Sequence, residues 1–393
     1  MMLTFATPLL LALTAAARPS SYAVWGADSA ISRGQGNGLS SAGAAQVSYE
    51  HGEFQWALRL LLDRTGNQTY YNYILKGANN IVYDNGTVHG SYTLTDYVLD
   101  PIRTGPTFLY LYDKTGQAKW KTAANTFRSQ LNSHPRTAEG QFWHKKVYFN
   151  QGWLDGIYMG DVFYTAYTAK FDARNATAWA DITAQFQLMF DNTKQLPTAP
   201  NNTNLLYHGY DYSHTAVWAN ADRGHSPEVW DRALGWYMMA LVDTIELAPP
   251  SSGALRTTLL KILQTLAPPL RDAADPKTGV WWLVMTQPGR AGNYFESSGS
   301  MMFVYSLLKA VRLGYVPDKD GSIVKAAKKA YNYATANWVI DNGDGTMGWN
   351  NTVVVGSLNM AGDYNYYISQ AITLNDLKGL SAFILASLEY ELL

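Results

Sequence analysis

Five segments of the chain share one local pattern, and this repetition constrains the fold more than any other feature. In each, an apolar helix ends at a turn rich in Gly, Pro or polar residues and a second helix follows; Gly just after the last apolar position is a helix C-cap signal. The segments cover residues 60–74, 109–123, 167–182, 246–262 and 312–330. Residues 375–393 form a further apolar helix, which could close a sixth unit with the first helix of the chain. The sequence therefore predicts six helical hairpins.

The predicted helices are of two kinds. Residues 153–169 and 227–246 are apolar on almost every side, whereas residues 323–339 are amphipathic. Helices that are apolar all round lie inside a protein, and amphipathic helices cover them. Alternation of the two kinds around a closed ring predicts an all-α fold, the (α/α)6 barrel or six-hairpin toroid. Strand signals are confined to residues 280–285 and 351–356, and a two-domain helical array is the alternative.

Composition excludes several classes of site. The chain contains no cysteine, which excludes disulfides, thiol nucleophiles and cysteine metal ligands. Its net charge of -1 gives no reason to expect a nucleic acid or an anionic membrane as partner. Aromatic residues make up 13% of the chain, and their flat faces with polar tips suit sugar rings as well as a core.

The first residues resemble an export signal. Residues 3–17 are apolar and uncharged, and three alanines at 15–17 precede Arg18 and Pro19. Such a stretch is too short for a membrane span and is typical of a secretory signal peptide. We predict a signal peptide over residues 1–17 and a single secreted domain over residues 18–393; a buried first helix is the alternative. Five sequons could carry N-glycans, at Asn67, Asn85, Asn175, Asn201 and Asn350.

Asp155 is the first candidate for acid–base chemistry. Its helical face carries Tyr158, Met159 and Val162, an apolar stripe. Burial there raises the pKa of a carboxyl toward the range of a general acid, and a second carboxylate nearby would raise it further. Its place in the first helical turn favours the anion and opposes this effect. An Asp that only braces the helix start is the alternative.

Two further clusters could face the same rim of the ring. Asp100 precedes a proline, which is typical of a helix N-cap, and a cap at the rim could also face a pocket. Ser226 and Pro227 predict the start of a helix on which Arg232 and Trp236 share a face. A buried Arg pairs with a carboxylate of the protein or of a ligand, and both possibilities stay open.

The seven histidines show no metal-ligand spacing, so we expect no metal and no cofactor. His144 and His208 lie in aromatic loops just before predicted inner helices, where they could donate hydrogen bonds to sugar hydroxyls. A lone loop histidine is more often simply polar surface.

Several segments together resemble glycoside hydrolase family 105, the unsaturated rhamnogalacturonyl hydrolases. The resemblance runs from about Trp25 to the C-terminus and rests on five motifs in order: FWHKKVYFNQGWLDGIYM, LYHGYDY, WDRALGWYMMALVD, GNYFESSGSMMFVYSLLKAVRLGY and NDLKGLSAFILAS. It implies an (α/α)6 barrel in which Asp155 is the general acid/base and Asp100 assists it. It also implies a substrate pocket lined by Tyr49, His144, His208, Trp230, Arg232 and Trp236. Two positions depart from the family pattern: Lys378 replaces a usual His, and Asp231 replaces a small residue.

The resemblance implies hydration of a vinyl ether rather than the usual protonation of a glycosidic oxygen. The substrate would be a small oligosaccharide with a 4,5-unsaturated galacturonyl end, left by a polysaccharide lyase. Asp155 would protonate C4 and then activate the water that adds at C5, while Arg232 would hold either the uronate carboxylate or that water. The alternatives are an unsaturated glucuronyl hydrolase of family 88, an inverting (α/α)6 glycosidase and a non-catalytic secreted sugar-binding protein.

Overall fold

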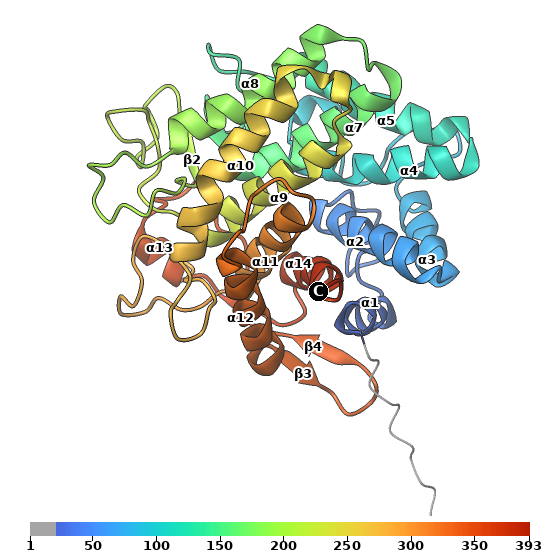
Figure 1. Ribbon diagram of the computed structural model, residues 1–393. Coiled ribbons are helices and arrows are strands. Elements are labelled where there is room, and N and C mark those ends of the chain that lie inside the picture. Colours follow the sequence, from blue (N-terminus) through green and yellow to red (C-terminus); the bar gives the residue numbers. More distant parts are fainter. Residues whose placement is uncertain (1–20) are drawn as a thin grey trace, which may run out of the picture.

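The helices of the computed structural model, which describes residues 21–393, pair into six consecutive hairpins around a common axis (Figure 1). The inner helices are α2 (Tyr49–Thr65), α4 (Gly105–Thr115), α7 (Val162–Phe171), α9 (Asp231–Leu247), α11 (Ser297–Arg312) and α14 (Leu377–Tyr390). The outer helices are α3 (Gln68–Asn79), α5 (Ala118–Ser133), α8 (Ala176–Thr193), α10 (Ala254–Asp272), α12 (Ser322–Asn337) and α1 (Tyr22–Ser32). The last inner helix, α14, packs against α11, α2 and α1, which closes the ring. The predicted (α/α)6 barrel is confirmed; the predicted signal peptide lies outside the described residues.

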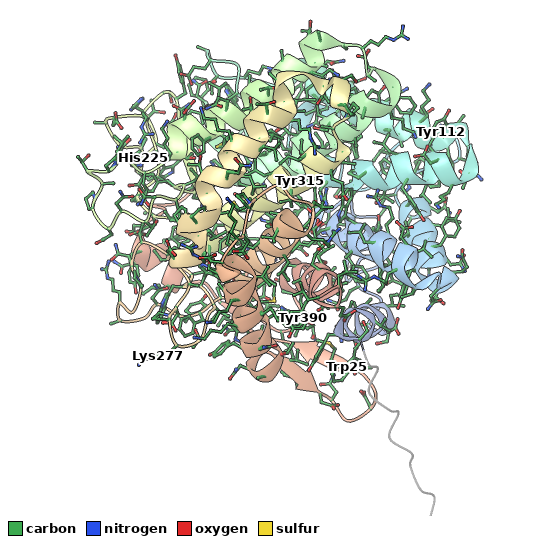
Figure 2. All side chains as sticks on the ribbon, in the orientation of Figure 1. Trp25, Tyr112, His225, Lys277, Tyr315 and Tyr390 are labelled. Carbon is green, nitrogen blue, oxygen red and sulfur yellow. The ribbon has the colours of Figure 1, made fainter. Side chains whose placement is uncertain are left out.

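Burial separates the two layers as the sequence predicts. Of the 17 residues of α9, 15 are buried, whereas 5 of the 16 residues of α12 are. Side chains fill the space between the layers (Figure 2). Gly66 ends α2 in the left-handed conformation, with φ 69°, and Asn67 then caps α3 by accepting a hydrogen bond from the Thr69 amide at 3.0 Å. The hairpin turns are therefore built from the residues that mark them in the sequence.

Short elements at the ends of the inner helices depart from the predictions. Residues 280–285 make isolated bridges rather than a strand, and residues 351–356 contribute only β5 (Thr352–Val353), which pairs with β6 (Ile372–Thr373). Two further pairs are β1 (Gln151–Trp153) with β2 (Gly209–Asp211), and β3 (Val339–Asp341) with β4 (Met347–Trp349). The predicted helix start at Ser226 and Pro227 is wrong, because residues 225–230 pair with neighbouring loops and α9 begins at Asp231. The remaining elements are η1 (Leu94–Asp96), η2 (Asp100–Thr104), α6 (Leu154–Gly156), η3 (Ile157–Asp161), η4 (Pro250–Ser252) and α13 (Tyr364–Ile368).

A buried group of charged and hydroxyl side chains joins the inner helices at the axis of the barrel. Arg103 donates to Glu53 at 2.9 Å and to the Tyr158 hydroxyl at 2.6 Å, and Tyr158 donates to the second oxygen of Glu53 at 3.1 Å. Asp243 lies 3.4 Å from the Tyr158 hydroxyl and accepts hydrogen bonds from Tyr305 at 2.6 Å and Lys309 at 2.7 Å. These residues, here called the axial cluster, come from η2, α2, η3, α9 and α11.

No helix within residues 21–393 has the length and apolar character needed to cross a membrane.

We expect Glu53→Ala to lower the free energy of unfolding by about 3–5 kcal/mol, because it leaves the buried Arg103 charge without its carboxylate. Glu53→Gln keeps an acceptor and should lose less. Urea denaturation followed by circular dichroism measures both. Asp84→Ala removes the partner of a surface pair with Lys119 and serves as the control, which should leave the midpoint unchanged. Equal midpoints for Glu53→Ala and the control would show that the axial cluster does not stabilise the barrel.

Candidate active site

A cavity of about 270 Å³ opens at the end of the barrel where the inner helices begin. Four residues singled out from the sequence line it: Tyr49, Asp100, His144 and Asp155. Met159, which the sequence places on the apolar face of Asp155, also lines it. Seven residues that sequence reasoning missed complete the lining: Lys145, Tyr148, Trp153, Val355, Gly356, Ser357 and Asn359. The cavity is therefore built from segments that lie far apart in the chain.

The short sheet of β1 and β2 brings Asp155 next to His208. Its register pairs Trp153 with Gly209, and the Leu154 amide donates to the His208 carbonyl at 3.0 Å. Leu154, which follows β1, thus meets His208, which precedes β2, and Asp155 is the next residue along the chain. His208 Nε2 lies 3.1 Å from Asp155 Oδ2, and the imidazole is fully buried behind the carboxylate.

Tyr367 fixes the orientation of His208. The Tyr367 hydroxyl lies 2.7 Å from His208 Nδ1. Burial, with Asp155 nearby, raises the pKa of Tyr367 well above its usual value, so the hydroxyl keeps its proton. A hydroxyl that donates to Nδ1 leaves the imidazole proton on Nε2, facing Asp155.

The pKa of Asp155 departs from the expectation drawn from its apolar stripe. Burial alone would raise this pKa, but the nearby His208 ring, and after it His144, outweigh burial and hold the pKa below its usual value. The sequence-based expectation of a raised pKa is therefore wrong for the unliganded site. The reason is that the sequence placed His208 in the pocket but did not show that its imidazole, 53 positions further along the chain, lies 3.1 Å from the Asp155 carboxylate.

Asp100 faces the cavity but does not cap a helix. It is the first residue of η2, Leu99 occupies the cap position, and no side-chain capping bond is formed there. The Asp100 carboxylate instead contacts Lys145 Nζ at 2.7 Å and His144 Nε2 at 3.4 Å. Backbone pairing of Val98 with Lys145 places these groups side by side. The expectation of an N-cap is corrected accordingly.

The two neighbours of Asp100 differ in charge. Burial lowers the pKa of His144 to about 4, so this imidazole is neutral at pH 7. Burial also acts on Lys145, but the Asp100 carboxylate outweighs it and raises the pKa of this lysine above its usual value. Lys145 therefore stays charged and is the single Lys or Arg among the residues that line the cavity.

Stacked rings form one wall of the cavity. The Trp153 indole lies 4.5 Å from the His144 ring and 4.6 Å from the Tyr148 ring, nearly parallel to both. Met159 and Val355 add further apolar surface to the lining. Aromatic faces of this kind pack against the C–H faces of sugars, while Asp100 and Lys145, next to this wall, can meet hydroxyl and carboxylate groups.

Four residues expected to line the pocket lie behind its wall instead: His208, described above, and Trp230, Arg232 and Trp236. Trp236 packs between Tyr49 and Tyr158, with ring centroids 6.2 and 5.1 Å away. Trp230 lies behind Gly356, where a Cβ would come within 2.8 Å of the indole. Both indoles support the lining from outside, and neither is among the residues that face the cavity.

Arg232 also lies behind the wall, where it holds a loop. Its guanidinium donates to the Val353 carbonyl at 2.7 Å, to the Val354 carbonyl and to Ser298 Oγ at 3.1 Å. Glu296, which lies 3.8 Å from Arg232, accepts a hydrogen bond from the Val353 amide. This segment continues directly into residues 355–359 of the cavity lining. In this structure the buried Arg is thus paired with the protein itself, one of the two possibilities that the sequence left open.

Within residues 21–393, no group of three His, Asp or Glu side chains lies close enough together to hold a metal ion. The end of this six-hairpin toroid thus combines a carboxylate–imidazole pair, the Asp100–Lys145 ion pair and a wall of aromatic rings, groups suited to binding a carbohydrate and moving a proton at it.

The family model for Glycosyl Hydrolase Family 88 matches residues 27–393, and the chain belongs to this family of glycoside hydrolases. The resemblance to family 105 is confirmed: a solved C. acetobutylicum ATCC 824 structure described as a glycoside hydrolase from family 105 is 38% identical, with a TM-score of 0.87, over 95% of this chain and 100% of that one.

The chain is also similar to two further proteins. Protein Atu3128 of Agrobacterium fabrum is 33% identical over 232 residues, which cover 55% of this chain and 96% of that protein. The unsaturated glucuronyl hydrolase of Bacillus sp. GL1 shares the fold, with a TM-score of 0.61 at 13% identity over 94% of this chain and 96% of that one.

We expect His208→Gln to raise the pKa of Asp155, because burial remains while the imidazole that lowers this pKa is lost. The measurement is a ¹³C carboxyl NMR titration, with the signal assigned from its absence in Asp155→Asn. Asp100→Asn is the control; since Lys145 already compensates the Asp100 charge, the pKa of Asp155 should change much less. An unchanged or lowered pKa in His208→Gln would show that the imidazole does not set the state of Asp155.

We expect Arg232→Lys to lower kcat/KM for the sugar substrate by about 10- to 100-fold and to lower the melting temperature, because a point charge cannot serve two carbonyls and hydrogen bonds to charged groups contribute about 1.5–3 kcal/mol. Arg271→Lys, on the surface, should change neither quantity. Normal kinetics and normal stability in Arg232→Lys would contradict the assignment of Arg232 as the residue that positions the loop.

Proposed function

We propose that the protein removes 4,5-unsaturated galacturonyl residues from the lyase-generated ends of rhamnogalacturonan oligosaccharides. The observation that carries this proposal is the pairing of Asp155 with His208 at a cavity that the Asp100–Lys145 pair also lines. Membership in a glycoside hydrolase family with an unsaturated glucuronyl hydrolase among its structural neighbours supports the same reaction class.

Asp155 is the group placed to move the proton. In the proposed reaction its carboxyl, protonated once substrate excludes water from the cavity, adds a proton to C4 of the unsaturated ring. Positive charge then develops at C5 and the ring oxygen, and the ionised carboxylate takes a proton from the water that adds at C5. The resulting hemiketal opens to a ketone, and the hemiacetal left at C1 releases the other sugar. One carboxyl thus serves as acid and then as base.

His208 and the substrate act on the protonation of Asp155 at different stages of the reaction. The imidazole lies 3.1 Å from the carboxylate and stabilises the ionised form that takes a proton from water. A substrate carboxylate that enters the cavity brings negative charge near Asp155 and favours its protonated form. The Tyr367 hydroxyl keeps the imidazole aligned while the proton moves.

Lys145 is placed to bind the uronate carboxylate. It is charged, it lines the cavity, and Asp100 holds its ammonium group at 2.7 Å. Asp100 retains a role in orienting this cation and in accepting hydrogen bonds from substrate hydroxyls. This assignment differs from the expectation that Arg232 binds the carboxylate or the water. The Arg232 guanidinium instead donates hydrogen bonds to the carbonyls of residues 353 and 354.

An unsaturated glucuronyl hydrolase acting on glycosaminoglycan fragments is the second candidate. The fold is shared with such an enzyme, and an unsaturated glucuronyl unit presents the same carboxylate and double bond. The inverting glycosidase and the non-catalytic sugar-binding protein lack a comparable observation in their favour.

We further propose that the protein is secreted and carries N-glycans. Four of the sequon asparagines are exposed, Asn67, Asn85, Asn201 and Asn350, and Asn175 is partly exposed at the start of α8. Glycans at these positions would project into solvent. Mass spectrometry of the protein recovered from culture medium tests both points.

Incubation of the enzyme with two purified disaccharides tests the substrate. We expect the ultraviolet absorbance of the enoate to disappear faster with the unsaturated rhamnogalacturonan disaccharide than with the unsaturated chondroitin disaccharide. Faster loss with the chondroitin disaccharide would favour the glucuronyl hydrolase. No loss with either, together with release of sugar from saturated substrates, would exclude the hydration mechanism.

We expect Asp155→Asn to lower turnover by about 10²–10⁴-fold or more, because the amide can neither give a proton to C4 nor take one from water. Binding and the melting temperature should stay close to those of the wild type, since the amide matches the carboxylate in shape. Asp96→Asn, an exposed Asp outside the cavity, is the control. A rate like that of the wild type in Asp155→Asn would remove Asp155 as the acid.

A further inference from the structure

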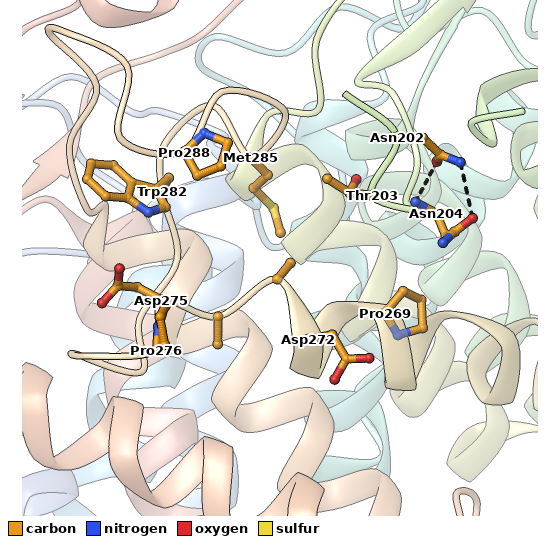
Figure 3. Close-up of a pocket in the computed structure, with 12 residues that line it drawn as sticks. Asn202, Thr203, Asn204, Pro269, Asp272, Asp275, Pro276, Trp282, Met285 and Pro288 are labelled. Atoms are coloured by element: carbon orange, nitrogen blue, oxygen red, sulfur yellow. Dashed lines mark hydrogen bonds between the residues drawn. The ribbon is translucent and has the colours of Figure 1, made fainter. Parts of the chain in front are cut away.

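A second cavity, of about 470 Å³, lies on the outer wall of the barrel. It is bounded by the C-terminal end of α10, the loop that follows α8 and the loop of residues 282–288 (Figure 3). Its volume lies in the range of about 300–1,000 Å³ that is usual for small-molecule sites. The reaction proposed above makes no use of it.

The walls of this outer cavity combine an aromatic plane with apolar edges. Trp282 is half-buried and packs on Phe295, with ring centroids 4.2 Å apart. Figure 3 shows Trp282 and Asp275 on one side, Asn202, Thr203 and Asn204 on the other, and Met285 between them. An indole held in place by a second ring offers a pre-formed face for stacking against the C–H face of a sugar.

Four polar atoms of the lining have no hydrogen-bond partner in the part of the chain that the structure describes. Within residues 21–393, no hydrogen bond reaches Asp272 Oδ2, Asp275 Oδ2, Asn204 Nδ2 or Trp282 Nε1. The first oxygen of Asp275 is already used by the amides of Lys277 and Thr278, at 3.0 and 2.8 Å, which fixes the carboxylate in place. Two acceptors and two donors around an indole are the combination that sugar hydroxyls require.

Charge selects among sugars. The outer cavity is lined by the carboxylates of Asp272 and Asp275 and by no Lys or Arg, although Arg271 contacts Asp272 at 2.7 Å. The active-site cavity also holds two carboxylates, but Lys145 in its lining offers a uronate a cation that the lining of the outer cavity does not. We propose that the outer cavity binds a neutral glycosyl residue; the choice of a saccharide as ligand class rests on the proposed function.

The backbone links the outer cavity to the rim of the active site. The Met285 amide donates to the Val229 carbonyl at 2.9 Å, and Val284 pairs with Trp230, the indole behind the active-site wall. A neutral branch or neighbouring sugar held at Trp282 would therefore stay at the same end of the barrel as the site that removes the charged terminal residue. The outer cavity would act as an anchoring site for branched oligosaccharides.

The probe is a neutral β-1,4-galactotetraose, and the comparison is an oligogalacturonide of equal length. Isothermal titration calorimetry in the Asp155→Asn background separates binding from turnover. We expect the neutral probe to bind, and Trp282→Ala to weaken this binding by about tenfold or more. Asn204→Ala should also weaken it. Tyr83→Ala, which removes an exposed ring elsewhere on the surface, is the control and should bind as the parent does.

Three results would overturn the proposal. They are failure of the neutral probe to bind both the parent and Asn201→Gln, binding of the neutral probe that survives Trp282→Ala, and equal or tighter binding of the oligogalacturonide to the outer cavity. Binding of the neutral probe only after Asn201→Gln would support a neutral-sugar site and would show that the protein's own glycan at Asn201, next to the lining residue Asn202, fills it.

Turnover of the unsaturated disaccharide by Trp282→Ala separates this proposal from the proposed function. Normal turnover combined with lost binding of the neutral probe supports both. Binding of the neutral probe at Trp282 without turnover by the wild type would defeat the proposed function alone.

Discussion

The rest of the barrel depends on the axial cluster, because there charged and hydroxyl groups of η2, α2, η3, α9 and α11 form one buried network. Arg103, Glu53 and Tyr158 bond to one another, and Asp243 links them to Tyr305 and Lys309, so each residue restricts the rotation of its own helix about its axis. A purely apolar interior tolerates repacking, whereas a buried charged cluster admits far fewer arrangements. Tyr158 also stacks on Trp236, which contacts Tyr49 at the cavity floor. The orientation set at the axis is thereby transmitted to the active site.

The architecture could be predicted from the sequence because it is encoded locally. Helix ends carry their own caps, as at Gly66 and Asn67, and the apolar and amphipathic patterns differ between layers. The start of α9 was misplaced because Ser226 and Pro227 carry the local signals of a helix start, while the residues that follow are held in loop pairings. A local signal for a helix start can thus be overridden by hydrogen bonds to segments elsewhere in the fold.

The candidate site could be predicted from the sequence only in part, because it is assembled from segments that lie far apart in the chain. Asp155 and Asp100 stand out in their own segments, but the partners that determine their charge, His208 and Lys145, are supplied by other segments. The wall formed by residues 355–359 has no chemical signature in the sequence, since Val355, Gly356 and Ser357 are ordinary loop residues. For Arg232, the sequence indicated a buried guanidinium with a partner. It could not show whether that partner is a bound ligand or, as in the structure, two backbone carbonyls.

The sixth hairpin joins the first and last helices described, and Ser21 Oγ donates to Glu391 across a separation of 370 positions, at 2.9 Å. The ring therefore remains open during synthesis until its final helix has emerged. Until then, the five preceding hairpins leave the apolar surfaces at the two open ends of the ring exposed. Closure of the ring is therefore a late step that depends on contacts between residues far apart in the chain. Because Ser21 and Glu391 lie side by side, the protein is a candidate for circular permutation. A linker between these two residues and a new opening in another outer loop would change the order in which the helices are made, while the ring itself would stay the same.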